Sequence, residues 1–144
     1  MRLTALEPQF MRYEVRIEER SYAKAVGCLD QPAHTHTDAC FEKQTGPCVH
    51  LPFVDRIEDA QGIKFLCPKC FTANHGPINT HGVICWSRSR GVPDDAKPYP
   101  GRWRLVGTSY EDLSLMEEPG HTRSVQLTGE GCKWHGFVTD GEVT

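Results

Sequence analysis

Short runs in which apolar and polar residues alternate at every second position recur along the chain. Met11, Tyr13, Val15 and Ile17 alternate with charged residues, so residues 10–19 are predicted to form a half-exposed strand. Similar runs predict further strands at residues 51–57, 63–66, 82–87, 102–106, 113–115 and 124–128. Ten prolines and thirteen glycines leave few stretches long enough for a helix. The pattern therefore predicts a mostly β protein.

A tight hairpin is predicted near the C-terminal end. Residues 136–139 and 142–144 flank Asp140-Gly141, a dipeptide that suits the positive φ angles of a two-residue turn. Two other segments look irregular, namely residues 28–50, rich in His and Cys, and the proline-rich residues 88–101. No linker divides the chain. We therefore expect a single domain over residues 1–144, with residues 1–50 an N-terminal extension packed on a β core at 51–144.

Two ligand-x-x-ligand motifs carry the clearest chemistry. Cys67-Pro68-Lys69-Cys70 and Cys132-Lys133-Trp134-His135 each place two metal-binding side chains three positions apart. In such a turn both side chains point at one ion while backbone amides lean toward the thiolates. Cys67, Cys70, Cys132 and His135 together supply the Cys3His set of a closed tetrahedral Zn²⁺ site. The residues that follow the first motif offer substitutes for His135, namely His75, His81 or Cys85.

A second group of metal-binding residues lies in the irregular N-terminal segment. It comprises His34, His36, Cys40, Cys48 and His50. His-x-His and Cys-x-His pairs on an extended chain place both side chains on one side, so this group could hold a second ion. The alternative is a polar loop with incidental histidines, because no pair here has the x2 spacing. The sequence predicts one Zn²⁺ and leaves two open.

Composition narrows the classes of function. The chain has 144 residues, 38% of them hydrophobic, and a formal net charge of −3, which argues against a broad nucleic-acid-binding surface. No apolar run approaches the length of a membrane span, and residues 1–8 are too polar for a signal peptide. We expect a cytoplasmic protein with reduced thiols. Its odd number of cysteines, seven, then favours metal binding over disulfides.

Signatures of catalysis are weak. Cys40-Phe41-Glu42 followed by Cys67-x2-Cys70 superficially matches the motifs of zinc deaminases, but Leu66 stands where that pattern has proline. The adjacent acidic residues Asp94-Asp95 and Glu117-Glu118 are predicted to lie in exposed turns rather than to form a catalytic pair. No catalytic residue is predicted.

One further set of residues is informative as a combination, namely residues 63–70, Trp103, Ser124-Val125, residues 131–138 and the Asp140-Gly141 turn. In these residues the C-terminal half resembles a family of small uncharacterised proteins of bacteriophages and prophages that contain a domain of unknown function. The resemblance covers about residues 63–144 and implies a β-rich zinc-binding domain, without an assigned activity. If the chain is phage-encoded, its compartment is the host cytoplasm.

These observations favour a small zinc-ribbon-like antiparallel β domain with an irregular His/Cys-rich N-terminal segment. We expect a non-enzymatic module that binds or modulates another macromolecule, with a host protein as partner by analogy with phage proteins. The alternatives are a zinc-dependent hydrolase or deaminase and a zinc-ribbon nucleic-acid-binding protein. Arginine and aromatic residues anchor many interfaces, so the expected binding surface is Arg88, Arg90, Tyr99, Arg102 and Trp103, although Trp103 could instead be a core residue.

Overall fold

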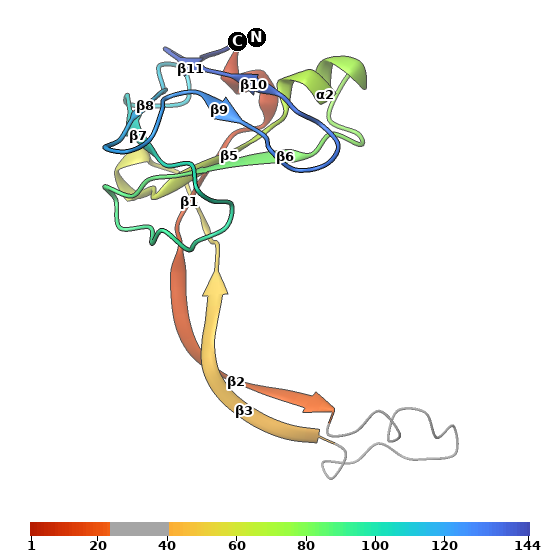
Figure 1. The fold of residues 1–144 in the computed structure, drawn as a ribbon, viewed down its shortest axis with the longest axis vertical. Helices are drawn as coiled ribbons and strands as arrows, with labels where there is room; N and C mark the ends of the chain where they lie inside the picture. The colour runs from red at the N-terminus through yellow and green to blue at the C-terminus, as the bar shows by residue number, and fades with distance from the viewer. Residues whose placement is uncertain (24–40) are drawn as a thin grey trace. The chain divides into compact units, whose positions relative to one another are not determined.

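Strands form most of the regular structure, as the alternating pattern predicted (Figure 1). The computed structural model describes residues 1–23 and 41–144. These residues form two compact units, one of residues 1–13 and 51–144 and the other of residues 14–50. None of the helices in the described ranges is long and apolar enough to cross a membrane.

A four-stranded antiparallel sheet organises the first unit. Its strand order is β4-β1-β5-β6, so β6 is an outer strand. Alternate residues of β5, such as Ile63 and Phe65, are buried, and they pack with Leu3 and Leu6 of the 3-10 helix η1. The main core thus forms on one face of this sheet, and a smaller buried cluster of Met11, Trp86, Val92 and Ala96 packs on the other. The bounds are η1 (Leu3–Leu6), β1 (Gln9–Met11), β4 (Phe53–Val54), β5 (Gly62–Leu66) and β6 (Gly82–Trp86).

Three short antiparallel pairs complete this unit. Trp103 and Leu105 of β7 are buried while Arg104 and Val106 are exposed, which reproduces the expected alternation. The last pair closes through Asp140 and Gly141, whose φ angles of 47° and 74° are both positive, so the expected tight turn is confirmed. The pairs are β7 (Trp103–Val106) with β8 (Ser114–Glu117), β9 (Val125–Gln126) with β10 (His135–Gly136), and β11 (Val138–Thr139) with β12 (Glu142–Val143).

Both ends of the chain belong to the first unit. The Met1 amino group donates a hydrogen bond to the Val143 carbonyl oxygen at 3.1 Å, and Figure 1 shows the two ends side by side. Phe10 on β1 is buried and stacks on Tyr110 with ring centroids 4.2 Å apart. Residues 1–13 are therefore part of the β core, whereas the sequence placed them in an extension that ended at residue 50.

The second unit is a two-stranded antiparallel ribbon of β2 (Glu14–Ala23) and β3 (Phe41–His50). Residues 41–50 were expected to be irregular, and this expectation is wrong. Gly46 and Pro47 argued against a strand, but each strand of a two-stranded ribbon is an edge, where proline is tolerated. The strand expected at residues 10–19 is also split between β1 and β2, and Val15 and Ile17 are exposed. A mostly β fold is confirmed, and the likeness to a zinc ribbon stays a prediction.

Candidate metal centre

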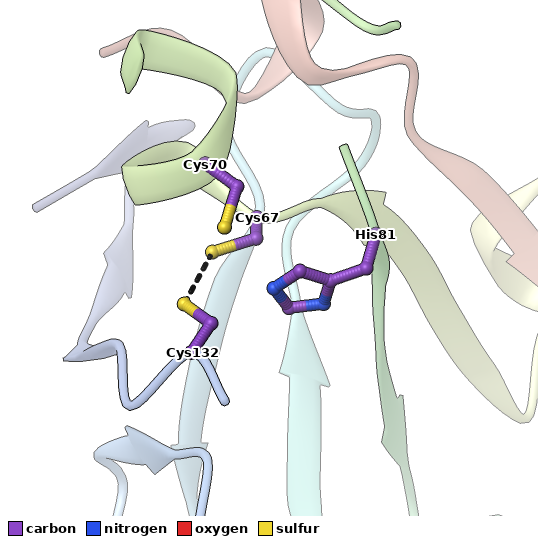
Figure 2. A group of neighbouring side chains, drawn as sticks. All are labelled: Cys67, Cys70, His81 and Cys132. Carbon is purple, nitrogen blue, oxygen red and sulfur yellow. Dashed lines mark hydrogen bonds between the residues drawn. The ribbon is translucent and has the colours of Figure 1, made fainter. Parts of the chain in front are cut away.

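Four side chains from separate parts of the first unit converge on one point. They are Cys67, Cys70, His81 and Cys132, and one ligand atom of each lies within 4.8 Å of all the others. Figure 2 shows the three sulfur atoms and the imidazole ring turned toward one another. Three thiols and an imidazole at this separation form a group that could hold a metal ion.

The first two members are positioned where β5 runs into a short helix. Cys67 is the N-cap of α2 (Pro68–Ala73), with the extended angles φ −60° and ψ 121°. Pro68 occupies the first helical position, where its fixed φ is favourable and its missing N–H costs nothing. One turn later Cys70 points back toward Cys67. The x2 spacing thus works through a helical turn.

His81 is brought to the group by the pairing of β5 with β6. These strands are antiparallel with Leu66 opposite Gly82, and the Cys67 amide donates to the His81 carbonyl oxygen at 2.9 Å. The His81 Nδ1 lies 3.3 Å from the Gly82 carbonyl oxygen. A proton on Nδ1 donated to this carbonyl leaves the lone pair of Nε2 free, which is the usual arrangement for a histidine that binds a metal.

Cys132 comes from the loop that joins β9 to β10. Its sulfur lies 3.6 Å from the sulfur of Cys67, which is 65 positions earlier in the chain. Cys67 is buried, Cys70 and Cys132 are half-buried, and His81 is exposed. The group therefore lies at the boundary between the hydrophobic core and solvent.

His135, the expected fourth ligand, is not a member of this group. It lies on the two-residue strand β10, opposite Gln126. The preceding side chain, Trp134, is buried edge-on against Phe65, with ring centroids 6.1 Å apart. Since neighbouring strand residues face opposite sides, His135 points outward, where its ring stacks on Phe137. The structure brings His81 into this place instead.

Protons are unevenly distributed among the thiols. A hydrogen bond with His81 is the main cause that lowers the pKa of Cys132 to about 6. The hydrogen bond with Cys132, followed by burial, raises the pKa of Cys70 to about 11. Burial raises the pKa of Cys67, while hydrogen bonds from the backbone of Cys70 and Lys69 oppose this shift. These amides lean toward the thiol as the motif predicted, and a divalent cation would replace the shared protons.

The other expected ligands lie elsewhere. Cys85 is fully buried in the core, and burial raises the pKa of its thiol. His75 is exposed after α2. For the second group, His34, His36 and Cys40 lie outside the described residues. Cys48 and His50 lie on β3, where His50 Nε2 is 2.7 Å from a Glu18 carboxylate oxygen, and neither belongs to a metal-binding group among the described residues.

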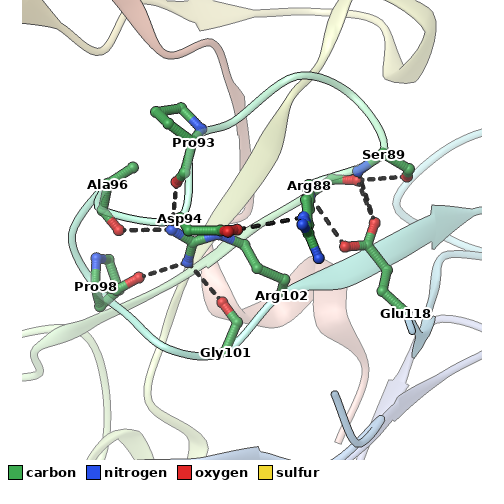
Figure 3. Close-up of polar contacts among 10 residues, drawn as sticks. Arg88, Ser89, Pro93, Asp94, Ala96, Pro98, Gly101, Arg102 and Glu118 are labelled. Carbon is green, nitrogen blue, oxygen red and sulfur yellow. Dashed lines mark hydrogen bonds and ion pairs between the residues drawn. The ribbon is translucent and has the colours of Figure 1, made fainter. Parts of the chain in front are cut away.

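The expected binding surface is largely turned inward. Arg102 is fully buried, and its two terminal nitrogens donate hydrogen bonds to four carbonyl oxygens of the 88–101 loop (Figure 3). Trp103 is 7% exposed and its indole donates to the Arg123 carbonyl oxygen. The Arg90 guanidinium donates to the Ile57 and Ala60 carbonyl oxygens. The four oxygens that accept from Arg102, at 2.7 to 2.9 Å, are the backbone carbonyls of Pro93, Ala96, Pro98 and Gly101.

Two residues of that surface remain available to a partner. Tyr99 is 57% exposed, and the Arg88 side chain is exposed and forms an ion pair with Asp94 at 3.3 Å. Assigning Arg90, Arg102 and Trp103 to an interface was therefore wrong. The two guanidinium groups donate to backbone carbonyl oxygens within the fold, and the Trp103 side chain is buried in the core. A long loop without regular structure needs partners for its backbone, and Arg102 supplies four of them.

Glu118 holds the start of the same loop. Its carboxylate is 3% exposed and accepts hydrogen bonds from the Ser87 hydroxyl and from the Arg88 and Ser89 amides, at 3.0 to 3.1 Å. Burial would raise the pKa of Glu118, but the hydrogen bonds, chiefly from Ser89, hold it below its usual value. The expectation that Glu117-Glu118 forms an exposed turn is wrong for Glu118.

Replacing Arg102 should destabilise the first unit strongly. Arg102→Ala leaves four carbonyl oxygens in the loop without their donor, so we expect the free energy of unfolding to fall by about 3 kcal/mol or more. The matched control is Arg88→Ala, which removes an exposed ion pair and should cost less than about 1 kcal/mol. Urea unfolding followed by tryptophan fluorescence measures both. Equal effects of the two variants would contradict the structural role of Arg102.

In comparisons with known proteins, no family model, no curated protein and no solved structure matched the chain. The resemblance to the phage family therefore stays a prediction. What is established is a mostly β protein that carries a Cys3His group able to hold a metal ion.

Proposed function

We propose that the chain is a non-enzymatic binding module whose first unit is stabilised by one structural Zn²⁺. The observation that carries this proposal is the convergence of Cys67, Cys70, His81 and Cys132. Three thiolates and one imidazole form a donor set typical of structural zinc, and thiolates discriminate against Mg²⁺ and Ca²⁺, which prefer oxygen.

The donor set also argues against catalysis. A catalytic zinc keeps three protein ligands and an open position for water, whereas four protein ligands close the tetrahedron. Among the described residues, no carboxylate belongs to the group to act as a base. The hydrolase or deaminase alternative depends on Cys40, which lies outside the described residues, and on the side chain of Glu42, of which the structure gives no description.

Nucleic-acid binding is the weaker alternative. The chain has a formal net charge of −3. Of the arginines in the 88–104 region, Arg90 and Arg102 donate to carbonyl oxygens within the fold, so they are not available to phosphates. Phosphate contacts dominate nucleic-acid affinity, and they need exposed cations. A protein partner suits this surface better.

Zinc would act as a cross-link in this unit. It would join the end of β5, the start of β6 and the β9–β10 loop, which are separated by as many as 65 positions. Strands β9 and β10 have two residues each, so their ladder alone supplies little stability. Metal binding would supply folding free energy where the sheet is shortest.

Metal titration of single variants tests which residues bind the ion. We expect one Zn²⁺ in the first unit, and a loss of affinity in His81→Ala larger than the ten- to hundredfold that outer-shell changes cause. Co²⁺ substitution should show thiolate charge-transfer bands and tetrahedral d–d bands in the wild type, altered in His81→Ala. The matched control is His135→Ala, which should bind as the wild type does. Loss in His135→Ala with normal binding in His81→Ala would refute the assigned ligand set.

Removal of zinc should lower the thermal stability of the first unit. At a free Zn²⁺ concentration a thousand times Kd, binding stabilises the folded state by about 4 kcal/mol. For a unit of this size that corresponds to a rise in Tm of about 18 °C. Thermal unfolding measured by circular dichroism, with Zn²⁺ or with a chelator, gives the shift. An identical Tm in both conditions would show that the ion does not support the fold.

A further inference from the structure

A cavity adjoins the metal centre and opens along the outer strand of the sheet. Its volume is about 520 Å³, and His81 and Cys132 contribute to its wall. Val83 and Ile84, which are consecutive residues of β6, both line it. Side chains of consecutive strand residues point to opposite faces, so a cavity that touches both lies along the edge of the strand rather than on one face.

The register of the sheet leaves backbone groups unpaired at this edge. The Cys67 amide donates to the His81 carbonyl oxygen and the Ser87 amide donates to the Gln61 carbonyl oxygen. The backbone hydrogen bonds with β5 are therefore formed by the odd-numbered residues from 81 to 87. The N–H and C=O of Ile84 therefore point away from β5, toward the open edge. Within the described ranges, no backbone hydrogen bond outside the ladder uses them.

Strand β9, on the opposite wall of the cavity, also has unpaired backbone groups. The Leu127 amide donates to the Trp134 carbonyl oxygen at 3.0 Å, and Gln126 lies opposite His135. In this register the N–H and C=O of Gln126 point away from β10. Gln126 and Leu127 both line the cavity. One cavity is thus bordered by two strand edges that each present unpaired donors and acceptors.

The side chains around these edges are mostly apolar. Pro98, Tyr99 and Pro100 come from the 88–101 loop, and Leu127 from the end of β9. Glu130 is the one carboxylate side chain among the described lining residues, and it is exposed. The wall is therefore suited to an extended chain with an apolar side chain and a cationic residue beside Glu130.

We propose that this groove binds an extended segment of a partner protein, which adds a strand to the free edge of β6. Backbone pairing with Ile84 supplies hydrogen bonds, the apolar wall with Tyr99 holds one side chain, and Glu130 selects a Lys or Arg. This inference rests on the proposed function, because it specifies the partner of the binding module. Zinc would fix both walls, since His81 directly precedes β6 and Cys132 follows β9.

Selection from a random-peptide library on the zinc-loaded protein supplies the probe. We expect enriched peptides with alternating apolar residues and at least one Lys or Arg. N-methylation of the selected peptide at successive positions should weaken binding at every second residue, about tenfold for each lost backbone hydrogen bond. This test leaves the protein unchanged. Equal effects at all positions, no effect at any, or failure to enrich a peptide would overturn strand addition.

Variants of the protein locate the peptide. Tyr99→Ala should weaken binding about tenfold, and Glu130→Lys should weaken peptides with a basic residue more than peptides that lack it. The matched control is Phe53→Ala on β4, because Phe53 is also 57% exposed but does not line the cavity. Equal losses in Tyr99→Ala and Phe53→Ala would place the peptide elsewhere. Displacement of the peptide by a single-stranded oligonucleotide would assign the groove to nucleic acid and overturn the proposal.

Zinc content is measured for every variant, which separates the two proposals. Loss of peptide binding in Tyr99→Ala with one Zn²⁺ retained supports the groove. Normal peptide binding by a protein that binds no zinc would refute the structural zinc while the groove stands. A zinc-loaded protein that selects no peptide would refute the groove and leave the metal centre intact.

Discussion

The close approach of three sulfur atoms and one imidazole is the constraint on which the first unit depends. Thiols are weak hydrogen-bond partners, and two thiolates repel each other, so the group gains little as free side chains. The hydrogen bond with His81 is the main cause that lowers the pKa of Cys132, and the hydrogen bond with Cys132 is the main cause that raises the pKa of Cys70. A divalent cation would remove that conflict, since it would compensate the negative charges and hold all four residues in place.

Different interactions stabilise different parts of this unit. Around β1, β5 and β6, stability comes from apolar burial, with Leu3, Phe10 and Phe65 almost fully buried. The 88–101 loop depends instead on a buried cation, Arg102, and a buried anion, Glu118, which satisfy backbone carbonyls and amides respectively. The C-terminal strands from β9 to β12 have two residues each, and β12 is held by the hydrogen bond between the Met1 amino group and the Val143 carbonyl oxygen. The proposed ion would tie the β9–β10 loop to the end of β5.

The sequence was sufficient for features that depend on local spacing. Cys67 and Cys70 were found because their motif fixes two ligands within one turn, and Cys132 because its motif supplied one of the two expected ligands. Asp140-Gly141 was found because positive φ angles restrict residue choice. His81 depends instead on strand register. Pairing β5 with β6 places His81 opposite Cys67, so finding His81 required the register of two strands that are separated by α2. The expected His135 was displaced because burial of Trp134 set the orientation of β10.

The inward-facing arginines could not be inferred from local patterns. Arg90, Arg102 and Arg104 look alike in sequence, yet only Arg104 faces solvent. What decides between them is the position of carbonyl oxygens in an irregular loop, which depends on tertiary structure. The same reason explains why Glu118 was expected to be exposed. The strand at residues 41–50 was missed because its partner, β2, supplies the ladder that Gly46 and Pro47 disfavour locally.

The most direct test of the central claim is X-ray absorption spectroscopy at the zinc edge of the purified, zinc-loaded protein. The account predicts three Zn–S distances of about 2.3 Å and one Zn–N distance of 2.0–2.1 Å, with imidazole scattering from a single ring. A first shell of nitrogen and oxygen alone, or one with fewer than three sulfur atoms, would contradict the convergence of Cys67, Cys70 and Cys132 on one ion.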